Sequence, residues 1–209
     1  MTQTALETLL GRARGPLGAN AEVDFGPATG PFAELGRMLS RLNGFFAFDA
    51  GVQVFHAGGP GVGPELVTWN DESTWKHTYE GLTGETFCFG QDVLGTQFAI
   101  MHEHVVSLDP ETAQVRVIGP SLESWAAWLL DDPPVNATAN LARAWQDEHG
   151  ALGPDERLIP RQFFVLGGGY ELDNLIARDA ATAMRIRGPI AVQLKGLPDG
   201  AQVNLSVAE

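Results

Sequence analysis

Apolar residues recur every three to four positions in two segments near the start of the chain, which predicts two amphipathic helices. The first spans Thr4 to Arg14 and is ended by Gly15-Pro16. The second begins at Pro31, which suits a first helical turn, and ends at Asn43-Gly44. Between them, residues 15–30 are rich in Gly, Ala and Pro and predict a surface loop.

From residue 45 onwards the pattern changes to short apolar runs separated by turn residues, which predicts an antiparallel meander. Asp49-Ala50-Gly51 is typical of a hairpin turn between the first two runs. A short helix, capped by Asn70 or Asp71, interrupts the meander and carries Trp75 and Tyr79. The predicted strands are 45–48, 52–55, 86–89, 97–101, 104–108 and 114–118.

The last third of the chain alternates between the two patterns. Ser121, or alternatively Ser124, caps a helix that ends at the Asp131-Asp132-Pro133-Pro134 run. The other predicted elements are a helix over 136–149, a strand over 170–176, a helix over 179–187, and strands over 190–194 and 202–207 that pair across the turn at 197–200.

This order of elements predicts an α+β fold with a mostly antiparallel central sheet flanked by helices and a C-terminal α/β extension. The Pro-rich run at Asp131–Val135 is the best candidate for a boundary. We therefore divide the chain into an N-terminal helix and loop (1–30), a core (31–135) and a C-terminal extension (136–209) packed on the core.

Composition narrows the class of protein. Of 209 residues, 44% are hydrophobic and 19% charged, which indicates a globular chain. No apolar run approaches the ~18 residues of a membrane span, and the first residues lack the features of a secretory signal. The single cysteine, Cys88, cannot form an internal disulfide and is expected to be a buried structural thiol. We therefore expect a cytoplasmic protein.

The charge is strongly acidic and unevenly distributed. The chain has 13 basic and 26 acidic side chains, a net charge of −13, which argues against nucleic acid or anionic membrane as direct partners. Between Leu42 and Val115, ten acids and a single base, Lys76, give −9 of this total. This stretch is interpreted either as a solvated face or as a docking surface for a basic protein.

Motifs for catalysis are missing. His102-Glu103-His104 would place two imidazoles on one face of a strand, but zinc needs a third or fourth ligand, so two exposed histidines are the favoured interpretation. Gly167-Gly168-Gly169 lacks the residues of a phosphate loop and predicts a turn. We therefore expect no catalytic residue, no resident metal and no cofactor. Most tryptophans are expected in the core, with Trp69 and Trp128 as exposed exceptions.

Several weak motifs follow one another in a recognisable order. They are Leu42-Asn43-Gly44-Phe45, Trp69-Asn70 before Trp75 and Tyr79, the run from Phe87 to Phe98 with Gly90-Gln91-Asp92, Leu108-Asp109-Pro110-Glu111-Thr112, and Ser121-Leu122-Glu123-Ser124-Trp125. This order, over about residues 35 to 132, resembles the SUKH superfamily of fungal cell-wall-synthesis regulators and many bacterial proteins. Residues 156–168 and 174–175 resemble a C-terminal segment of some bacterial members. The turn at 111–114 lacks the glycine usual there, and residues 1–30 match no part of the family.

The resemblance implies binding rather than catalysis. Bacterial members are commonly immunity proteins that bind and block a cognate toxin, and many such toxins are basic nucleases or deaminases. An acidic partner can substitute for the charge of the nucleic acid in such an active site. The expected function is therefore non-catalytic neutralisation of a cognate bacterial toxin, which in many such systems is basic. The alternatives are a housekeeping or regulatory binding module of the same fold, and a metalloprotein that uses His102 and His104. The candidate partner-binding residues are Trp69, Asp71, Glu72, Glu80, Glu85 and Asp92.

Overall fold

The computed structural model describes residues 3–198 and confirms the α+β fold with a mostly antiparallel sheet. Six antiparallel strands form one sheet in chain order, and a second sheet pairs two more strands. The strands are β1 Phe45–Ala47, β2 Val52–Val54, β3 Phe87–Asp92, β4 Gln97–Met101, β5 His104–Leu108, β6 Val115–Gly119, β7 Glu156–Pro160 and β8 Leu175–Asp179.

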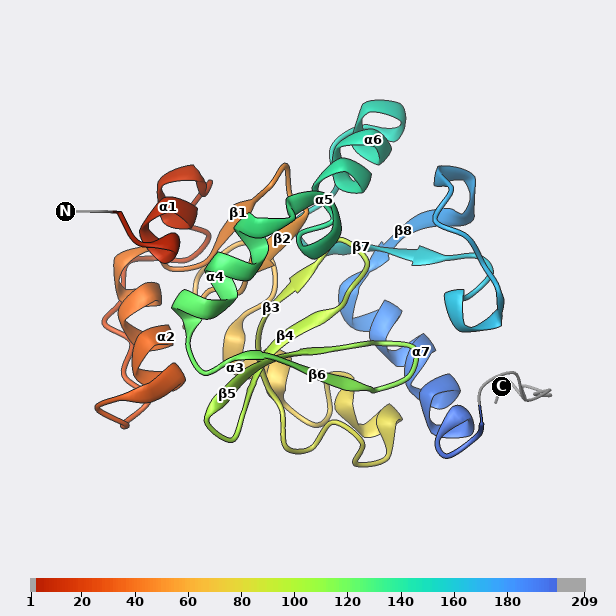
Figure 1. Cartoon of the computed structure of the whole chain (residues 1–209), viewed down its shortest axis with the longest axis horizontal. Coiled ribbons are helices and arrows are strands. Elements are labelled where there is room, and N and C mark those ends of the chain that lie inside the picture. The colour runs from red at the N-terminus through yellow and green to blue at the C-terminus, as the bar shows by residue number, and fades with distance from the viewer. Residues whose placement is uncertain (1–2, 199–209) are drawn as a thin grey trace.

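Helices lie at both ends and on both faces of the large sheet. Figure 1 shows α1 and α2 at one end of the molecule and α7 with the small sheet at the other. The helices are α1 Ala5–Arg12, α2 Gly30–Arg41, α3 Leu66–Asn70, α4 Leu122–Asp131, α5 Pro133–Asn136, α6 Ala139–His149 and α7 Ala180–Leu194, with 3-10 turns η1 Lys76–Tyr79, η2 Phe164–Leu166 and η3 Leu172–Asn174.

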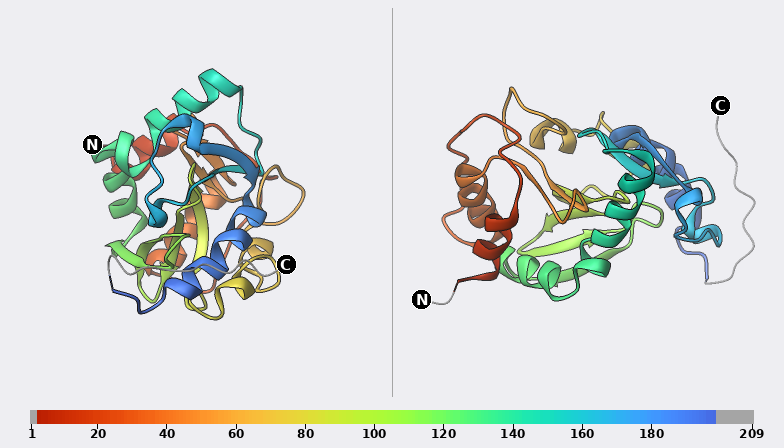
Figure 2. Two further views of the ribbon diagram at one scale, coloured as in Figure 1. Left: turned by 90° about the vertical axis from the view of Figure 1, so that its right-hand side faces the viewer. Right: turned by 90° about the horizontal axis from the view of Figure 1, so that it is seen from above.

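The core has an aromatic layer on each face of the large sheet. Helices α3 and α4 lie on opposite faces (Figure 2, right). On the α4 face, the ring of Trp125 meets Phe89 and Phe98 edge-on, with centroids 5.2 and 5.6 Å away. On the α3 face, Trp69 lies 5.1 Å from Phe55. Because aromatic side chains bury large apolar areas, these layers fix the position of both helices on the sheet.

Polar caps join the helices of the first half. Ser121 Oγ accepts the backbone N–H of Ser124 at 3.1 Å, which confirms Ser121 as the cap of α4. In the first turn of α4, the Glu123 carboxylate accepts the N–H groups of Ala5 and Leu6 at 2.6 and 3.0 Å. A carboxylate at the start of α1 is favoured by the positive end of that helix, so α4 anchors α1.

The C-terminal helix corrects the prediction most clearly. The predicted helix over 179–187 continues to Leu194, so the predicted strand over 190–194 is wrong. Gly188-Pro189 favours a helix end locally, but tertiary packing overrides it. Gly188 packs so closely on η1 that an added Cβ would lie 2.3 Å from Thr78 Oγ1, and Ala191 is fully buried. The predicted strand over 202–207 lies outside the described residues.

Other differences are smaller. Asp71 ends α3 instead of capping the next helix, and that helix is only the 3-10 turn η1. The helix predicted over 136–149 begins at Ala139, after the separate short α5. The strand predicted over 170–176 begins at Leu175, and its partner β7 was missed. In each case the apolar pattern covers too few residues to determine the local structure, which depends on contacts with residues distant in sequence.

A row of buried glutamines runs across the large sheet. Gln53, Gln91 and Gln97 are cross-strand neighbours on β2, β3 and β4, and all three are 0% exposed. Their amides bond in sequence, at 3.0 Å from Gln91 to Gln53 and 3.3 Å from Gln97 to Gln91. Trp69 Nε1 donates to Gln97 at 2.8 Å, and Arg157 of β7 donates to Gln53. The ladder therefore connects α3 to the C-terminal sheet through the core.

Four buried charged residues lie where the C-terminal part packs on the large sheet; we call them the charged joint. They are Asp92, Glu111, Arg157 and Arg187, of which Asp92 is the most exposed at 7%. Arg187 Nε lies 3.9 Å from Glu111 Oε1, and its guanidinium also donates to Leu158 O at 3.2 Å. Burial lowers the pKa of both arginines and raises the pKa of both acids.

Candidate functional site: an acidic cleft beside three phenylalanines

Four of the predicted partner-binding acids come from one connecting segment. Asp71, Glu72, Glu80 and Glu85 are all exposed and lie between the end of α3 and the start of β3. This segment is the yellow region at the bottom of Figure 1. The structure therefore places these carboxylates at the surface, where they can reach a partner.

Trp69 does not belong to that surface. Its side chain is only 3% exposed and packs between Phe55 and Trp75, with ring centroids 5.1 and 5.9 Å away. Its indole N–H is used by Gln97. The expectation that Trp69 is exposed is wrong, because α3 turns this residue towards the sheet. Trp128, the other predicted exception, is half-buried against Phe98.

Asp92 is also separated from the exposed acids. Its Oδ1 accepts the N–H groups of Leu94 and Thr96 at 2.8 and 2.9 Å, which shapes the turn after β3. The chain covers this turn, since Leu158 N donates to Val93 O at 2.8 Å. Desolvation by this burial raises the pKa of Asp92 to about 6. Asp92 is thus a buried carboxylate of the charged joint rather than part of the outer surface.

The single base of the acidic stretch is buried. Lys76 is 5% exposed, and its ammonium group donates to Thr86 O at 2.5 Å, in the wall of the cleft described below. The ammonium also lies 5.8 Å from the centre of the Trp75 ring. Within residues 42–115, therefore, the fully exposed charges are all negative.

Two of the exposed acids line a cleft of about 580 Å³. Asp71 and Glu85 stand in its wall with Val67, which is 68% exposed. The rings of Phe32 and Phe87 form the apolar side of the same cleft. Apolar residues inside a polar rim are the usual arrangement of a protein-binding surface. Glu72 and Glu80 are exposed nearby in sequence but do not line this cleft. We call the cleft with its rim, Asp71 and Glu85, the acidic cleft.

Asp71 is fixed by its own turn. Its Oδ1 accepts bonds from the backbone N–H and the hydroxyl of Ser73, at 2.8 and 2.5 Å. These bonds lower the pKa of Asp71 because they favour the charged form. A negative charge is therefore held in a defined position at the rim at neutral pH.

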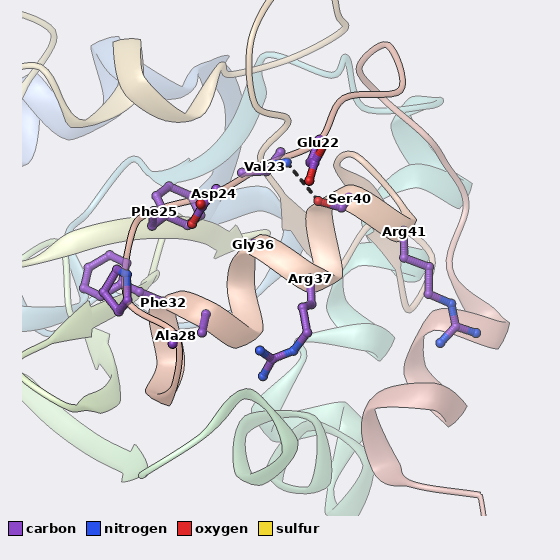
Figure 3. Close-up of a pocket in the computed structure, with 12 residues that line it drawn as sticks. Glu22, Val23, Asp24, Phe25, Ala28, Phe32, Gly36, Arg37, Ser40 and Arg41 are labelled. Atoms are coloured by element: carbon purple, nitrogen blue, oxygen red, sulfur yellow. Dashed lines mark hydrogen bonds between the residues drawn. The ribbon is translucent and has the colours of Figure 1, made fainter.

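The phenylalanines of the acidic cleft belong to a cluster of three half-buried rings. Phe25, Phe32 and Phe87 contact one another with centroids 5.4 to 5.8 Å apart. On the far side of this cluster is a second cavity, of about 600 Å³, between α2 and the loop at 22–28. In Figure 3, Phe25 and Phe32 lie next to each other on one side of this cavity, while Arg37 and Arg41 extend away from the two rings. Val23 N donates to Ser40 Oγ at 2.9 Å and holds the loop on α2.

The histidine pair does not form a metal site. His102 lies in the turn between β4 and β5 with a φ of 54°, and His104 begins β5, so the two do not share a strand face as predicted. Among residues 3–198, no group of three His, Cys, Asp or Glu side chains is arranged to hold a metal ion. Cys88 is buried, as predicted, and desolvation raises the pKa of its thiol to about 11, which makes it a poor nucleophile.

The residues of the charged joint other than Asp92 were not predicted from the sequence. Arg157 and Arg187 are 1% and 0% exposed, which is unusual for basic side chains. The neighbouring residues in the sequence give no clear indication that these side chains are buried. Glu111 was counted with the acidic stretch, yet it is 2% exposed and accepts the N–H of Val165 at 3.0 Å. The one available signal was that Arg157 directly precedes the apolar residues Leu158 and Ile159.

Comparisons with known proteins give little further guidance. The sequence matches no known family model and no curated protein sequence. The crystal structure of Atu4351 from Agrobacterium tumefaciens is similar to this chain, with a TM-score of 0.48 and 14% sequence identity over 87% of each chain. No helix in the described part of this chain is long and apolar enough to cross a membrane.

Proposed function

We propose that this chain is a non-catalytic binding protein that docks a basic protein partner on the acidic cleft. The observation that supports this most is that Asp71 and Glu85 are exposed in the wall of an apolar cleft. Lys76 also lines the cleft, but it is only 5% exposed and its ammonium group donates to Thr86 O. A surface of this kind steers an oppositely charged partner and anchors it on apolar side chains.

The partner that fits the resemblance best is a cognate toxin, and we propose an immunity-type role. A basic nuclease or deaminase has a positive active site, and a negative surface that covers it competes with nucleic acid. Asp71 and Glu85 would meet basic side chains at the rim, while Val67, Phe32 and Phe87 would contact apolar groups. Glu72 and Glu80 would add to the field from outside the cleft.

A regulatory or housekeeping module that binds an endogenous protein is the second candidate. The same cleft supports it equally, because charge and shape do not identify the partner. The metalloprotein alternative has lost its main support, since His102 and His104 do not share a strand face and have no third ligand among the described residues.

Co-expression tests the proposal. A basic protein toxin encoded beside this chain in its own genome is produced in a host cell, with and without this protein. We expect growth to be restored and a one-to-one complex to be purified. Restored growth that is lost with Asp71→Lys/Glu85→Lys supports the immunity role. No rescue and no complex would refute it, and a complex with an endogenous protein instead would favour the regulatory role.

A further inference from the structure

A cavity of about 590 Å³ lies apart from the acidic cleft, between the turn after β3, the start of α6 and the loop before η3. We call it the Asp92 cavity. Its volume falls in the range of small-molecule pockets, roughly 300–1,000 Å³. Its apolar walls include Leu94, Pro134, Val135, Leu141 and the ring of Tyr170.

The walls leave apolar and aromatic surface uncovered. Val135 is 70% exposed and Tyr170 is 61% exposed. The Tyr170 ring is held in place by stacking on Phe164, with centroids 4.2 Å apart and planes 16° apart. A rigid aromatic ring at the edge of a cavity offers a face for an apolar ligand.

Asp92 supplies a negative group to this cavity. The residue lines the cavity although it is only 7% exposed. Both backbone N–H groups that bond to the carboxylate go to Oδ1, and the Thr96 hydroxyl is a further hydrogen-bond partner of the carboxylate. Among residues 3–198, no basic nitrogen lies within ion-pair distance of Asp92; Arg157 and Arg187 act on it only from farther away. A buried carboxylate without an ion-pair partner favours a cationic donor.

The start of α6 supplies the opposite polarity. This helix has 11 residues, and its N-cap, Thr138, makes no side-chain cap bond because its hydroxyl donates to Gly51 O at 3.1 Å. The backbone N–H groups of Asn140 and Leu141 make no hydrogen bond with another described residue, and both residues line the cavity. Free N–H groups at the positive end of a helix bind anions.

We propose that the Asp92 cavity binds a small zwitterion with an apolar body, the chemistry of an apolar α-amino acid. Its ammonium group contacts Asp92, its carboxylate accepts the N–H groups at the start of α6, and its side chain packs on Val135 and Tyr170. A purely cationic ligand would leave the helix N–H groups unpaired, and a purely anionic ligand would leave Asp92 without an ion-pair partner. The site uses no residue of the acidic cleft and is independent of the proposed function.

Four probes of one shape test the charges separately. They are L-phenylalanine, phenethylamine without the carboxylate, phenylpropionate without the ammonium, and phenylethanol with neither, each titrated calorimetrically into the full chain. We expect L-phenylalanine to bind at least about tenfold more tightly than either singly charged probe. Equal affinity for phenylethanol and L-phenylalanine, or no saturable binding of L-phenylalanine at millimolar concentration, would overturn the proposal.

Two substitutions should act on different probes. Asp92→Asn should weaken L-phenylalanine and phenethylamine about 10- to 100-fold and leave phenylpropionate unchanged. Asn140→Asp should weaken L-phenylalanine and phenylpropionate but not phenethylamine, whereas the matched Asn140→Gln changes none of them. Asn140 is exposed, and an acid there favours the helix, so this variant tests the site even if Asp92→Asn does not fold. Equal weakening of all four probes by either variant would contradict the assigned contacts.

Discussion

The exposed acids of the α3–β3 segment and the buried acids of the charged joint belong to the same acidic stretch, yet their surroundings are opposite. Asp71 and Glu85 face solvent around an apolar cleft, and Lys76, which also lines it, is only 5% exposed and donates to Thr86 O. Glu111 pairs with the buried Arg187 of α7, and Asp92 lies buried farther from Arg187 and from Arg157 of β7. The same residue types therefore line an open cleft in one region and are buried under the C-terminal part in the other.

This difference changes how each charged side chain affects the free energy of unfolding. Exposed carboxylates remain hydrated and contribute little to stability, whereas buried ones depend on a partner or on their hydrogen bonds. Substitutions in the joint should therefore change stability, and substitutions in the acidic cleft should change binding alone.

The largest expected effect comes from Arg187→Met. Arg187 is 0% exposed and compensates Glu111, so its removal leaves a buried acid without its base. The free energy of unfolding, measured by urea titration, should fall by about 3–5 kcal/mol. The matched control is Arg185→Met on the same helix, whose side chain is 40% exposed and should change stability by less than about 1 kcal/mol. Equal losses in the two variants would mean that burial of charge is not what distinguishes them.

The next effect is a pH dependence due to Asp92. Its pKa is about 6 in the folded chain against an ordinary value of 3.8, because desolvation outweighs the field of Arg187 and the bonds from Leu94 and Thr96. Between pH 4 and 6 the unfolded carboxyl is ionised while the folded one keeps its proton, so stability falls as pH rises through this window. The loss is about 3 kcal/mol at roughly 1.4 kcal/mol for each pH unit.

Asp92→Asn isolates this effect from the rest of the joint. Glu111, Arg157, Asp109 and Tyr170 remain in both proteins and cancel in the comparison of wild type with variant. We expect the wild type to lose stability relative to the variant from pH 4 to 6, and the two curves to run parallel above pH 7. A constant difference over the whole range would contradict the raised pKa.

A smaller loss is expected in the glutamine ladder. Gln97→Leu leaves Trp69 Nε1 and Gln91 without their partner in a buried setting. Such groups cost about 1–3 kcal/mol, which denaturant unfolding can measure. Gln114→Leu, at an exposed position, is the control and should remain within about 0.5 kcal/mol. If both variants are equally stable, the ladder does not stabilise the sheet.

The sequence predicted the parts of the fold that depend on local signals. The meander from Phe45 to Gly119 followed from alternating apolar runs and turns, and Ser121 was correctly identified as a cap. The C-terminal part failed because its structure depends on distant contacts. Gly188-Pro189 continues a helix only because η1 is packed against it, and β7 needs both β8 and the turn at Val93.

The candidate site was predicted unevenly for the same reason. Exposed Asp71, Glu72, Glu80 and Glu85 lie in a polar connecting segment, as their neighbours indicate. Asp92 begins the turn Asp92-Val93-Leu94-Gly95, which the C-terminal part covers. The cleft itself could not be foreseen, because Phe32 reaches it from α2 and Phe87 from β3.

The smallest effect on stability is expected in the acidic cleft. Asp71→Lys/Glu85→Lys should shift the free energy of unfolding by about 1 kcal/mol or less, since both side chains are exposed. Thermal unfolding checks this. A loss as large as that of Arg187→Met would mean that these acids stabilise the fold rather than serve binding.

The most direct measurement is the affinity of this double variant for a basic toxin partner at low and at physiological salt. We expect binding to weaken at least about 100-fold at low salt, with a smaller difference at higher salt because the field is screened. Asp147→Lys/Glu148→Lys on α6 makes the same change in net charge and should weaken binding far less. Equal weakening by the two variants, or unchanged affinity of Asp71→Lys/Glu85→Lys at low salt, would contradict docking at the acidic cleft.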